Sequence, residues 1–249
     1  MSAPSRSLVI DVGNSGTKAV CFQRDEIMLP VQRLESGDWV GIDGMVTNLG
    51  VNNIIYSTVA NVPPQRWTDK WRASGLGVYF LDRNRTLPFT SAYLTMDTLG
   101  QDRIAAVAGT LGKVDTARLV VDAGSCITMD LVDRNDRYLG GSISPGVHLR
   151  LLAMHEHTAR LPLVDTGEVD GPVGRSTEQA LRHGGQLGAV YEIEGLYSRL
   201  VLEHTDLQIV LTGGDAALLL PYFSVPVLSY PHLVLCGLNQ ILSTYVSEL

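Results

Sequence analysis

The amino-acid sequence predicts an α/β protein made of two similar halves. Two observations support this prediction. Runs of β-branched residues alternate with segments whose apolar residues recur at helical spacing, which is the pattern of α/β folds. In addition, a strand-turn-strand segment whose first strand ends in Asp-x-Gly occurs twice, at an offset of 111 residues (122 − 11). Such a period is too long for a solenoid repeat and indicates two structurally similar domains.

The two repeated segments are predicted to be β-hairpins. The first covers residues 8–22, where β-branched residues flank the turn Gly13-Asn14-Ser15-Gly16. Clusters of Asn, Ser and Gly favour the positive φ angles of tight turns. The second covers residues 119–132, and Asp122 aligns with Asp11 without a gap between the two segments. Each hairpin therefore carries a carboxylate at the end of its first strand.

Six further elements complete the prediction. Strands are expected at residues 53–60, 77–81 and 207–211, and helices at residues 100–108, 145–159 and 176–200. The chain divides near residues 112–117, which gives an N-terminal domain of residues 1–115 and a C-terminal domain of residues 116–249. No low-complexity linker separates the halves, so we expect them to pack closely around a shared cleft.

The composition limits the possible partners and compartments. The net charge of −7 and the absence of a basic stripe argue against a nucleic-acid partner. The three cysteines are odd in number and form no C-x-x-C pair, which favours a reducing compartment. Neither a signal peptide nor an uninterrupted apolar span is found, so no membrane association is expected. These features predict a cytoplasmic protein.

The turn of the first hairpin is suited to a triphosphate. Its small residues let backbone N–H groups approach phosphate oxygens, Lys18 adds a cation, and Asp11 supplies charge for a metal ion. A Walker P-loop is not present in the sequence. One such turn alone is more often an ordinary hairpin. The second hairpin, together with the Gly213-Gly214 pair after a predicted strand, makes phosphate binding the better interpretation.

The two hairpins and the Gly-Gly turn together resemble the actin, sugar-kinase and Hsp70 superfamily. The resemblance implies two similar ribonuclease-H-like (actin-like ATPase) domains that face each other across a nucleotide cleft. Within that superfamily the sequence is most similar to type III pantothenate kinases, over essentially the whole chain. Their G-x-D-R motif is matched by Gly100-Gln101-Asp102-Arg103, and their G-G-x-I-x-P-G motif by residues 140–146. A further family motif matches residues 174–180, and Tyr93 occupies the place of the family's substrate tyrosine.

This resemblance implies an activity and its ligands. The expected reaction is ATP-dependent phosphorylation of the primary hydroxyl of pantothenate to 4′-phosphopantothenate, the first step of coenzyme A biosynthesis. Mg²⁺ is expected to arrive with ATP, and a monovalent cation, K⁺ or NH₄⁺, is expected near the nucleotide. The family is typically homodimeric, so a homodimer is expected here.

The resemblance also assigns roles to individual residues. Asp102 is the expected proton acceptor, although an acid at a helix start and a surface base would also explain Asp102 and Arg103. Ser125 replaces the family's usual threonine, which keeps the hydroxyl, and Cys126 replaces a commoner alanine and is expected to be a buried thiol. Thr177 is expected to contact the substrate or to cap the helix that follows. The expected ATP-binding residues are Asp11, Val12, Gly13, Asn14, Ser15, Gly16, Thr17, Lys18 and Ser125, the substrate-binding residues are Tyr93, Gly100, Gln101, Asp102, Arg103 and Thr177, and the metal-binding residue is Asp122.

Two other functions remain open from the sequence. One is a kinase of the same superfamily for another small alcohol or acid, but such enzymes are usually longer and lack the G-x-D-R segment. The other is a non-catalytic accessory regulator that keeps the fold. The presence of Asp11, Asp102 and Asp122 favours an enzyme over a regulator.

Overall fold

The computed structural model describes residues 5–13, 16–58 and 62–248. The chain forms two compact units, one of residues 1–111 with 233–249 and one of residues 112–232. Both contain a β-sheet with helices, so the predicted α/β class is confirmed. Residues 233–249 were expected in the second domain, whereas they cluster with the first unit because their helix packs on the first unit's sheet.

The first unit is built on a six-stranded sheet in the order β3-β2-β1-β5-β6, with β4 also paired to β2. Strands β1 and β2 form the predicted first hairpin, and β5 and β6 continue the sheet in parallel with β1. The elements of this unit are β1 (Arg6–Gly13), β2 (Gly16–Gln23), β3 (Glu26–Ile27), β4 (Gln32–Leu34), α1 (Trp39–Leu49), β5 (Asn53–Thr58), α2 (Gln65–Ala73), β6 (Gly77–Phe80), β7 (Thr90–Ser91), the 3₁₀ turn η1 (Met96–Thr98), α3 (Gln101–Ala108) and α8 (Leu233–Ser247).

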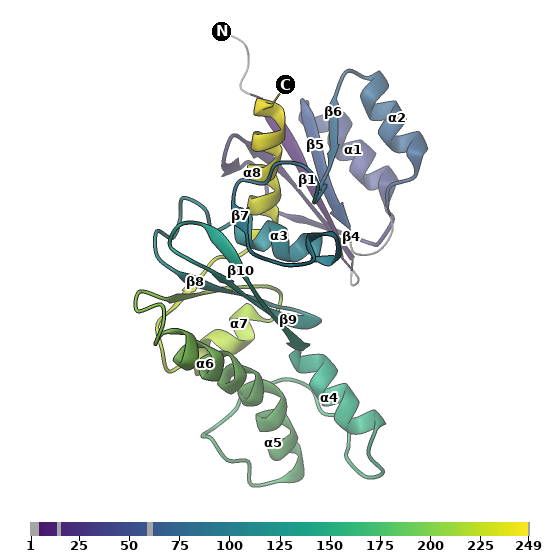
Figure 1. Ribbon diagram of the computed structural model, residues 1–249. Helices are drawn as coiled ribbons and strands as arrows, with labels where there is room; N and C mark the ends of the chain where they lie inside the picture. The colour runs from purple at the N-terminus through teal and green to yellow at the C-terminus, as the bar shows by residue number, and fades with distance from the viewer. Residues whose placement is uncertain (1–4, 14–15, 59–61, 249) are drawn as a thin grey trace. The chain divides into compact units, whose positions relative to one another are not determined.

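Strand β1 is buried on both faces, as expected for the centre of a helix-covered sheet. Alternate residues Leu8, Ile10 and Val12 form a core with side chains of α1 and α2. The C-terminal helix α8, yellow in Figure 1, packs against β1, β5 and α3. Asp11 belongs to the other alternate set of β1 residues, so it does not point into the core formed with α1 and α2.

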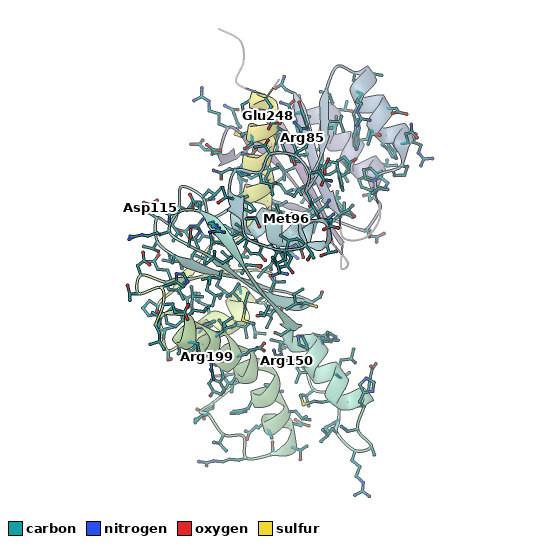
Figure 2. The ribbon with its side chains drawn as sticks, viewed as in Figure 1. Arg85, Met96, Asp115, Arg150, Arg199 and Glu248 are labelled. Carbon is teal, nitrogen blue, oxygen red and sulfur yellow. The ribbon has the colours of Figure 1, made fainter. Side chains whose placement is uncertain are left out.

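Helices α3 and α8 approach each other through two glycines. A Cβ atom on Gly237 of α8 would overlap the carbonyl oxygen of Ala105 in α3, and one on Gly109 would overlap that of Leu233. Near its end, α8 is joined to the segment after β6 by the ion pair between Arg85 and Glu248, whose N···O distance is 2.9 Å (Figure 2). The C-terminal helix is therefore an integral part of the first unit.

The second unit has a sheet in which β12, β11, β8, β9 and β10 follow one another. Strands β8 and β9 form the predicted second hairpin, β10 continues it as an antiparallel meander, and β11 lies parallel to β8. Side chains of α4, α6 and α7 form the core with β8, β9 and β11. The elements are β8 (Arg118–Ala123), β9 (Cys126–Val132), β10 (Arg137–Pro145), α4 (Val147–Glu156), α5 (Thr177–Arg182), the π-helical turn η2 (His183–Leu187), α6 (Gly188–Leu200), β11 (Gln208–Thr212), α7 (Ala216–Leu219), the 3₁₀ turn η3 (Leu220–Tyr222) and β12 (Val227–Ser229).

Candidate functional site

Asp11 lies near the end of β1 with a polar partner on each neighbouring strand. Across the antiparallel pair with β2 it is directly opposite Lys18. On β5, the Ser57 hydroxyl donates a hydrogen bond to Asp11 Oδ1 at 3.0 Å. Ser57 was not predicted as a site residue, because its role depends on the β1–β5 pairing, which brings residues 46 apart in sequence together.

The electrostatic environment of Asp11 opposes its negative charge. Burial raises the pKa of the Asp11 carboxyl above its ordinary value of 3.8, and the negative charge of Asp102 adds to this rise. The hydrogen bond from Ser57 and the positive charge of Lys18 lower the pKa but do not cancel the effect of burial. Asp102 is therefore close enough for the two carboxylates to repel. A bound cation would relieve this repulsion.

The G-x-D-R motif forms the start of α3. Gly100 precedes the helix, and Asp102 lies in its first turn, where a carboxylate interacts favourably with the helix dipole. Asp102 Oδ1 accepts a hydrogen bond from the backbone N–H of Arg103 at 2.9 Å. The side chain of Asp102 is only partly buried, so it remains accessible from solvent.

Two other motif residues also meet in the first unit. Arg103 is 5% exposed, and its guanidinium carbon lies 5.8 Å from the centroid of the Tyr93 ring. That distance is typical of a cation–π contact. The expected substrate residues Tyr93, Asp102 and Arg103 therefore come from two segments that fold together, and their contacts with a substrate remain a prediction.

The residues of the first hairpin differ in how far their side chains could reach a nucleotide. Val12 and Thr17 are 0% and 1% exposed, so their side chains lie within the protein and only their backbone groups could reach a ligand. Gly16 has a φ of 141°, a region that glycine adopts readily. Asn14 and Ser15, which complete the predicted ATP-binding turn, lie outside the described residues. The ATP contacts of this hairpin remain a prediction.

In the second unit, glycine-containing turns meet at the end of β8. Asp122 pairs in register with Thr212 of β11, so the turn after each strand lies at the same edge of the sheet. Gly213 has a φ of 101°, and a Cβ atom there would meet the Asp122 carboxylate and the backbone of Ala123. Gly146 donates a backbone hydrogen bond to the Ser125 carbonyl at 3.1 Å. Three motifs recognised separately in the sequence thus form one polar edge.

Asp215 belongs to this edge and was not predicted. Its backbone N–H donates to the Ala123 carbonyl at 2.9 Å. Burial raises the pKa of the Asp215 carboxyl, and the charge of His148 partly lowers it. The sequence signal was present, because Asp215 directly follows the Gly-Gly pair, but its neighbourhood depends on the β8–β11 pairing.

Two expectations about local roles are wrong. The cap of α5 is Ser176, whose hydroxyl accepts a hydrogen bond from the Gln179 backbone N–H at 3.2 Å, so Thr177 is not the cap. Thr177 is exposed at the first helical position. Cys126 is exposed rather than buried, because it begins β9 directly beside the hairpin turn.

The donors around Asp122 suit a hard cation. Asp122 Oδ1 and the Ala123 carbonyl oxygen both lie within 2.5 Å of the point where a Cβ atom on Gly213 would be, so the two oxygens are close together, and oxygen donors are the ligands that such ions prefer. Within the described part of the chain, no group of three or more His, Cys, Asp or Glu side chains could hold a metal ion. A cation here would therefore depend on backbone oxygens and on bound ligands.

Over residues 5–13, 16–58 and 62–248, no helix combines the length and the apolar character needed to cross a bilayer.

Replacing Asp11 by Asn is expected to stabilise the ligand-free protein at neutral pH. Because the folded-state pKa of this acid is raised, ionisation costs stability as the pH rises from about 3.8 through the folded pKa. The Asp11→Asn protein should therefore melt at a higher temperature than the wild type at pH 7, and the difference should shrink toward pH 4. Thermal denaturation between pH 4 and 8 measures this, with the exposed Asp25→Asn as the control.

A lower melting temperature for Asp11→Asn across the whole pH range would contradict this account of Asp11. It would mean that the ionised carboxylate is held by its partners rather than destabilised by burial.

Known proteins share this fold and are similar in sequence. The fold, with an acid-bearing hairpin in each of its two units, is the actin-like ATPase fold. Solved structures share it: a candidate 2-dehydro-3-deoxygalactonokinase of Sinorhizobium meliloti has a TM-score of 0.58 at 13% identity, covering 96% of this chain and 99% of that one. A Campylobacter jejuni protein described as a candidate Baf-family transcriptional activator has a TM-score of 0.57 at 24% identity, covering 96% and 99%.

The sequence comparisons are more specific than the structural ones. Residues 7–199 match the family model of type III pantothenate kinase. The type III pantothenate kinase of Flavobacterium johnsoniae is 35% identical over 239 residues, covering 94% of this chain and 96% of that protein. That of Bacteroides fragilis is 34% identical over 242 residues, covering 95% and 97%. The chain belongs to the type III pantothenate kinase family.

Proposed function

We propose that this protein transfers the γ-phosphoryl group of ATP to the primary hydroxyl of pantothenate, forming ADP and 4′-phosphopantothenate. The observation that supports this most directly is the position of the G-x-D-R acid. Asp102 lies in the same unit as Asp11, and the two are linked through β5: the Ser57 hydroxyl donates to Asp11, and the backbone N–H of Thr58, the next residue, donates to the side chain of Gln101, which precedes Asp102. An acid for the acceptor alcohol and an acid for the metal–nucleotide are therefore neighbours.

The proposed step needs little covalent chemistry from the protein. Asp102 accepts the proton of the hydroxyl, the hydroxyl oxygen bonds to the γ-phosphorus, and the bond from that phosphorus to the leaving oxygen of ADP breaks. Mg²⁺ bound with ATP supplies neutralising charge on the phosphates. Asp11 is suited to hold that ion, and Lys18 lies opposite it on β2.

We propose further roles for the remaining site residues. Arg103, held against Tyr93, is suited to bind the substrate carboxylate or a phosphate. Asp122 and the Ala123 carbonyl are suited to a monovalent cation, K⁺ or NH₄⁺. Ser125, exposed at the second hairpin turn, is suited to donate a hydrogen bond to ATP. The roles of Arg103, Asp122 and Ser125 follow the family resemblance residue by residue, and the Ala123 carbonyl is included because it lies near the Asp122 carboxylate.

The proposal is tested by measuring ATP-dependent 4′-phosphorylation of pantothenate with the purified full chain, with and without K⁺. The expected result is turnover of pantothenate that is stimulated by K⁺ or NH₄⁺ and not by Na⁺. Turnover of another small alcohol but not of pantothenate would contradict the substrate. Nucleotide binding without turnover of any alcohol would contradict an enzymatic function and favour the regulator.

We also propose a homodimer in the cytoplasm. The dimer follows from the family resemblance, and the compartment from the cysteine pattern, which shows no disulfide framework. Equilibrium sedimentation of the active protein tests the dimer, and an active monomer would contradict it.

A further inference from the structure

Gln101 occupies the variable position of the G-x-D-R motif, next to the proposed proton acceptor. Its side chain is 2% exposed. The carboxamide oxygen accepts a hydrogen bond from the Thr58 backbone N–H at 2.8 Å, and the carboxamide nitrogen donates to the Leu81 carbonyl at 2.7 Å. Both ends of the amide are thus bonded to backbone groups of other elements.

These two bonds attach the start of α3 to the sheet. Thr58 is the last residue of β5, and Leu81 directly follows β6. The residue before the helix is Gly100, which provides no capping side chain. The first turn of α3, which carries Asp102, is therefore held to the ends of two parallel strands by the carboxamide of Gln101.

The same contacts connect the two acids of the first unit. Thr58 directly follows Ser57, whose hydroxyl is bonded to Asp11 at 3.0 Å. Gln101 directly precedes Asp102. A continuous path of covalent and hydrogen bonds therefore runs from Asp11 through Ser57, Thr58 and Gln101 to Asp102, and the hydrogen bond between Thr58 and Gln101 is its link between strand and helix.

Only a side chain that is both a donor and an acceptor can make these contacts. A carboxamide meets this requirement without charge. An ionised carboxylate is an acceptor only, so one of its negatively charged oxygens would face the Leu81 carbonyl oxygen and repel it. A methionine of similar size would fill the space but leave the Thr58 N–H and the Leu81 carbonyl without this partner.

We infer that Gln101 is a positioning residue that sets the place of Asp102 relative to Asp11, in place of the substrate contact expected from the motif. This inference rests on the proposed function, in which Asp102 accepts the proton of the acceptor alcohol. Phosphoryl transfer depends on alignment of the nucleophile, and a displacement of about 1 Å can cost on the order of 100-fold in rate. The carboxamide acts through Asp102 and does not touch the substrate.

The experiment compares Gln101→Met and Gln101→Glu with the wild type. Gln101→Met is expected to lower kcat by about 10- to 100-fold, with the KM for ATP within about twofold of the wild type, because the nucleotide hairpin is unchanged. The matched controls are Gln65→Met and Gln65→Glu, which change an exposed glutamine at the start of α2. Both controls should keep wild-type kcat.

The Gln101→Glu protein supplies a readout that a purely structural role would not give. When protonated, its carboxylic acid is a donor and an acceptor and can replace the carboxamide. The ratio of its kcat to that of the wild type should therefore rise as the pH falls, whereas the ratio for Gln101→Met should stay constant. Titratable groups that the variant and the wild type have in common affect both kcat values, so their effect on the ratio cancels.

The possible outcomes separate the inference from the proposed function. A wild-type protein that does not phosphorylate pantothenate contradicts the function, and the same ratios are then measured with an alcohol that it does phosphorylate. If no alcohol is phosphorylated, crystal structures of the wild type and of Gln101→Met replace kcat, and an unchanged position of Asp102 relative to Asp11 overturns the inference. With an active wild type, unchanged kcat in Gln101→Met overturns it. If Gln101→Met does not fold, the pH dependence of Gln101→Glu decides, and a flat ratio overturns it.

Discussion

Asp102→Asn is expected to lower kcat by about 100- to 10,000-fold, which is the usual contribution of a positioned general base. The amide keeps the size of the side chain and can still accept the hydrogen bond from the Arg103 backbone N–H, so the start of α3 should be unchanged. What it loses is the capacity to take the proton of the attacking hydroxyl. The measurement is steady-state turnover of pantothenate at saturating ATP.

The matched control for this prediction is Asp97→Asn. Asp97 lies five residues earlier in the short turn η1 and is exposed, so its substitution removes the same charge nearby without touching α3. It should keep kcat within about twofold. A modest loss for Asp102→Asn, similar to that of the control, would show that the alcohol loses its proton elsewhere.

Gly237→Ala is expected to destabilise the first unit by about 1–2 kcal/mol. The new methyl group would overlap the Ala105 carbonyl and meet the Gly109 nitrogen, so α3 and α8 would have to separate. Overpacking of this kind typically costs about 1–3 kcal/mol, and here it opposes the roughly 1 kcal/mol by which alanine normally favours a helix. Chemical denaturation followed by circular dichroism measures the change in the free energy of unfolding.

Gly44→Ala in α1 is the matched control for the helix effect. A Cβ atom at Gly44 would meet nothing within 4 Å, so this substitution should stabilise the protein by up to about 1 kcal/mol. Opposite signs for the two glycines are expected. Equal stabilisation by both would mean that α3 and α8 are not in close contact at Gly237.

The elements with strong local signals were predictable from the sequence. Both hairpins form, because their β-branched strands and Gly-containing turns agree with the long-range pairing. The helix predicted over residues 100–108 is observed as α3. The single helix predicted over residues 176–200 is instead interrupted by the π-helical turn η2, because periodicity does not reveal a change from i→i−4 to i→i−5 bonding.

Elements whose signal is spread over the fold were missed. Helices α1, α2 and α8 were not predicted from the sequence. The place of α8 in the first unit depends on contacts between residues more than 100 positions apart, which no local pattern contains. The same reason applies to Ser57 and Asp215, which become site neighbours only through strand pairing.

The membership of α8 in the first unit has a consequence for synthesis on the ribosome. Residues 112–232 form a unit of continuous chain, so all of its elements are translated before α8. The first unit begins earlier but lacks its last helix until residue 233 and those after it have been translated, about 6–24 s later at ordinary elongation rates. During that interval the nascent protein exposes the apolar faces of β1 and α3 that α8 will cover, so the half of the chain made first is the half completed last.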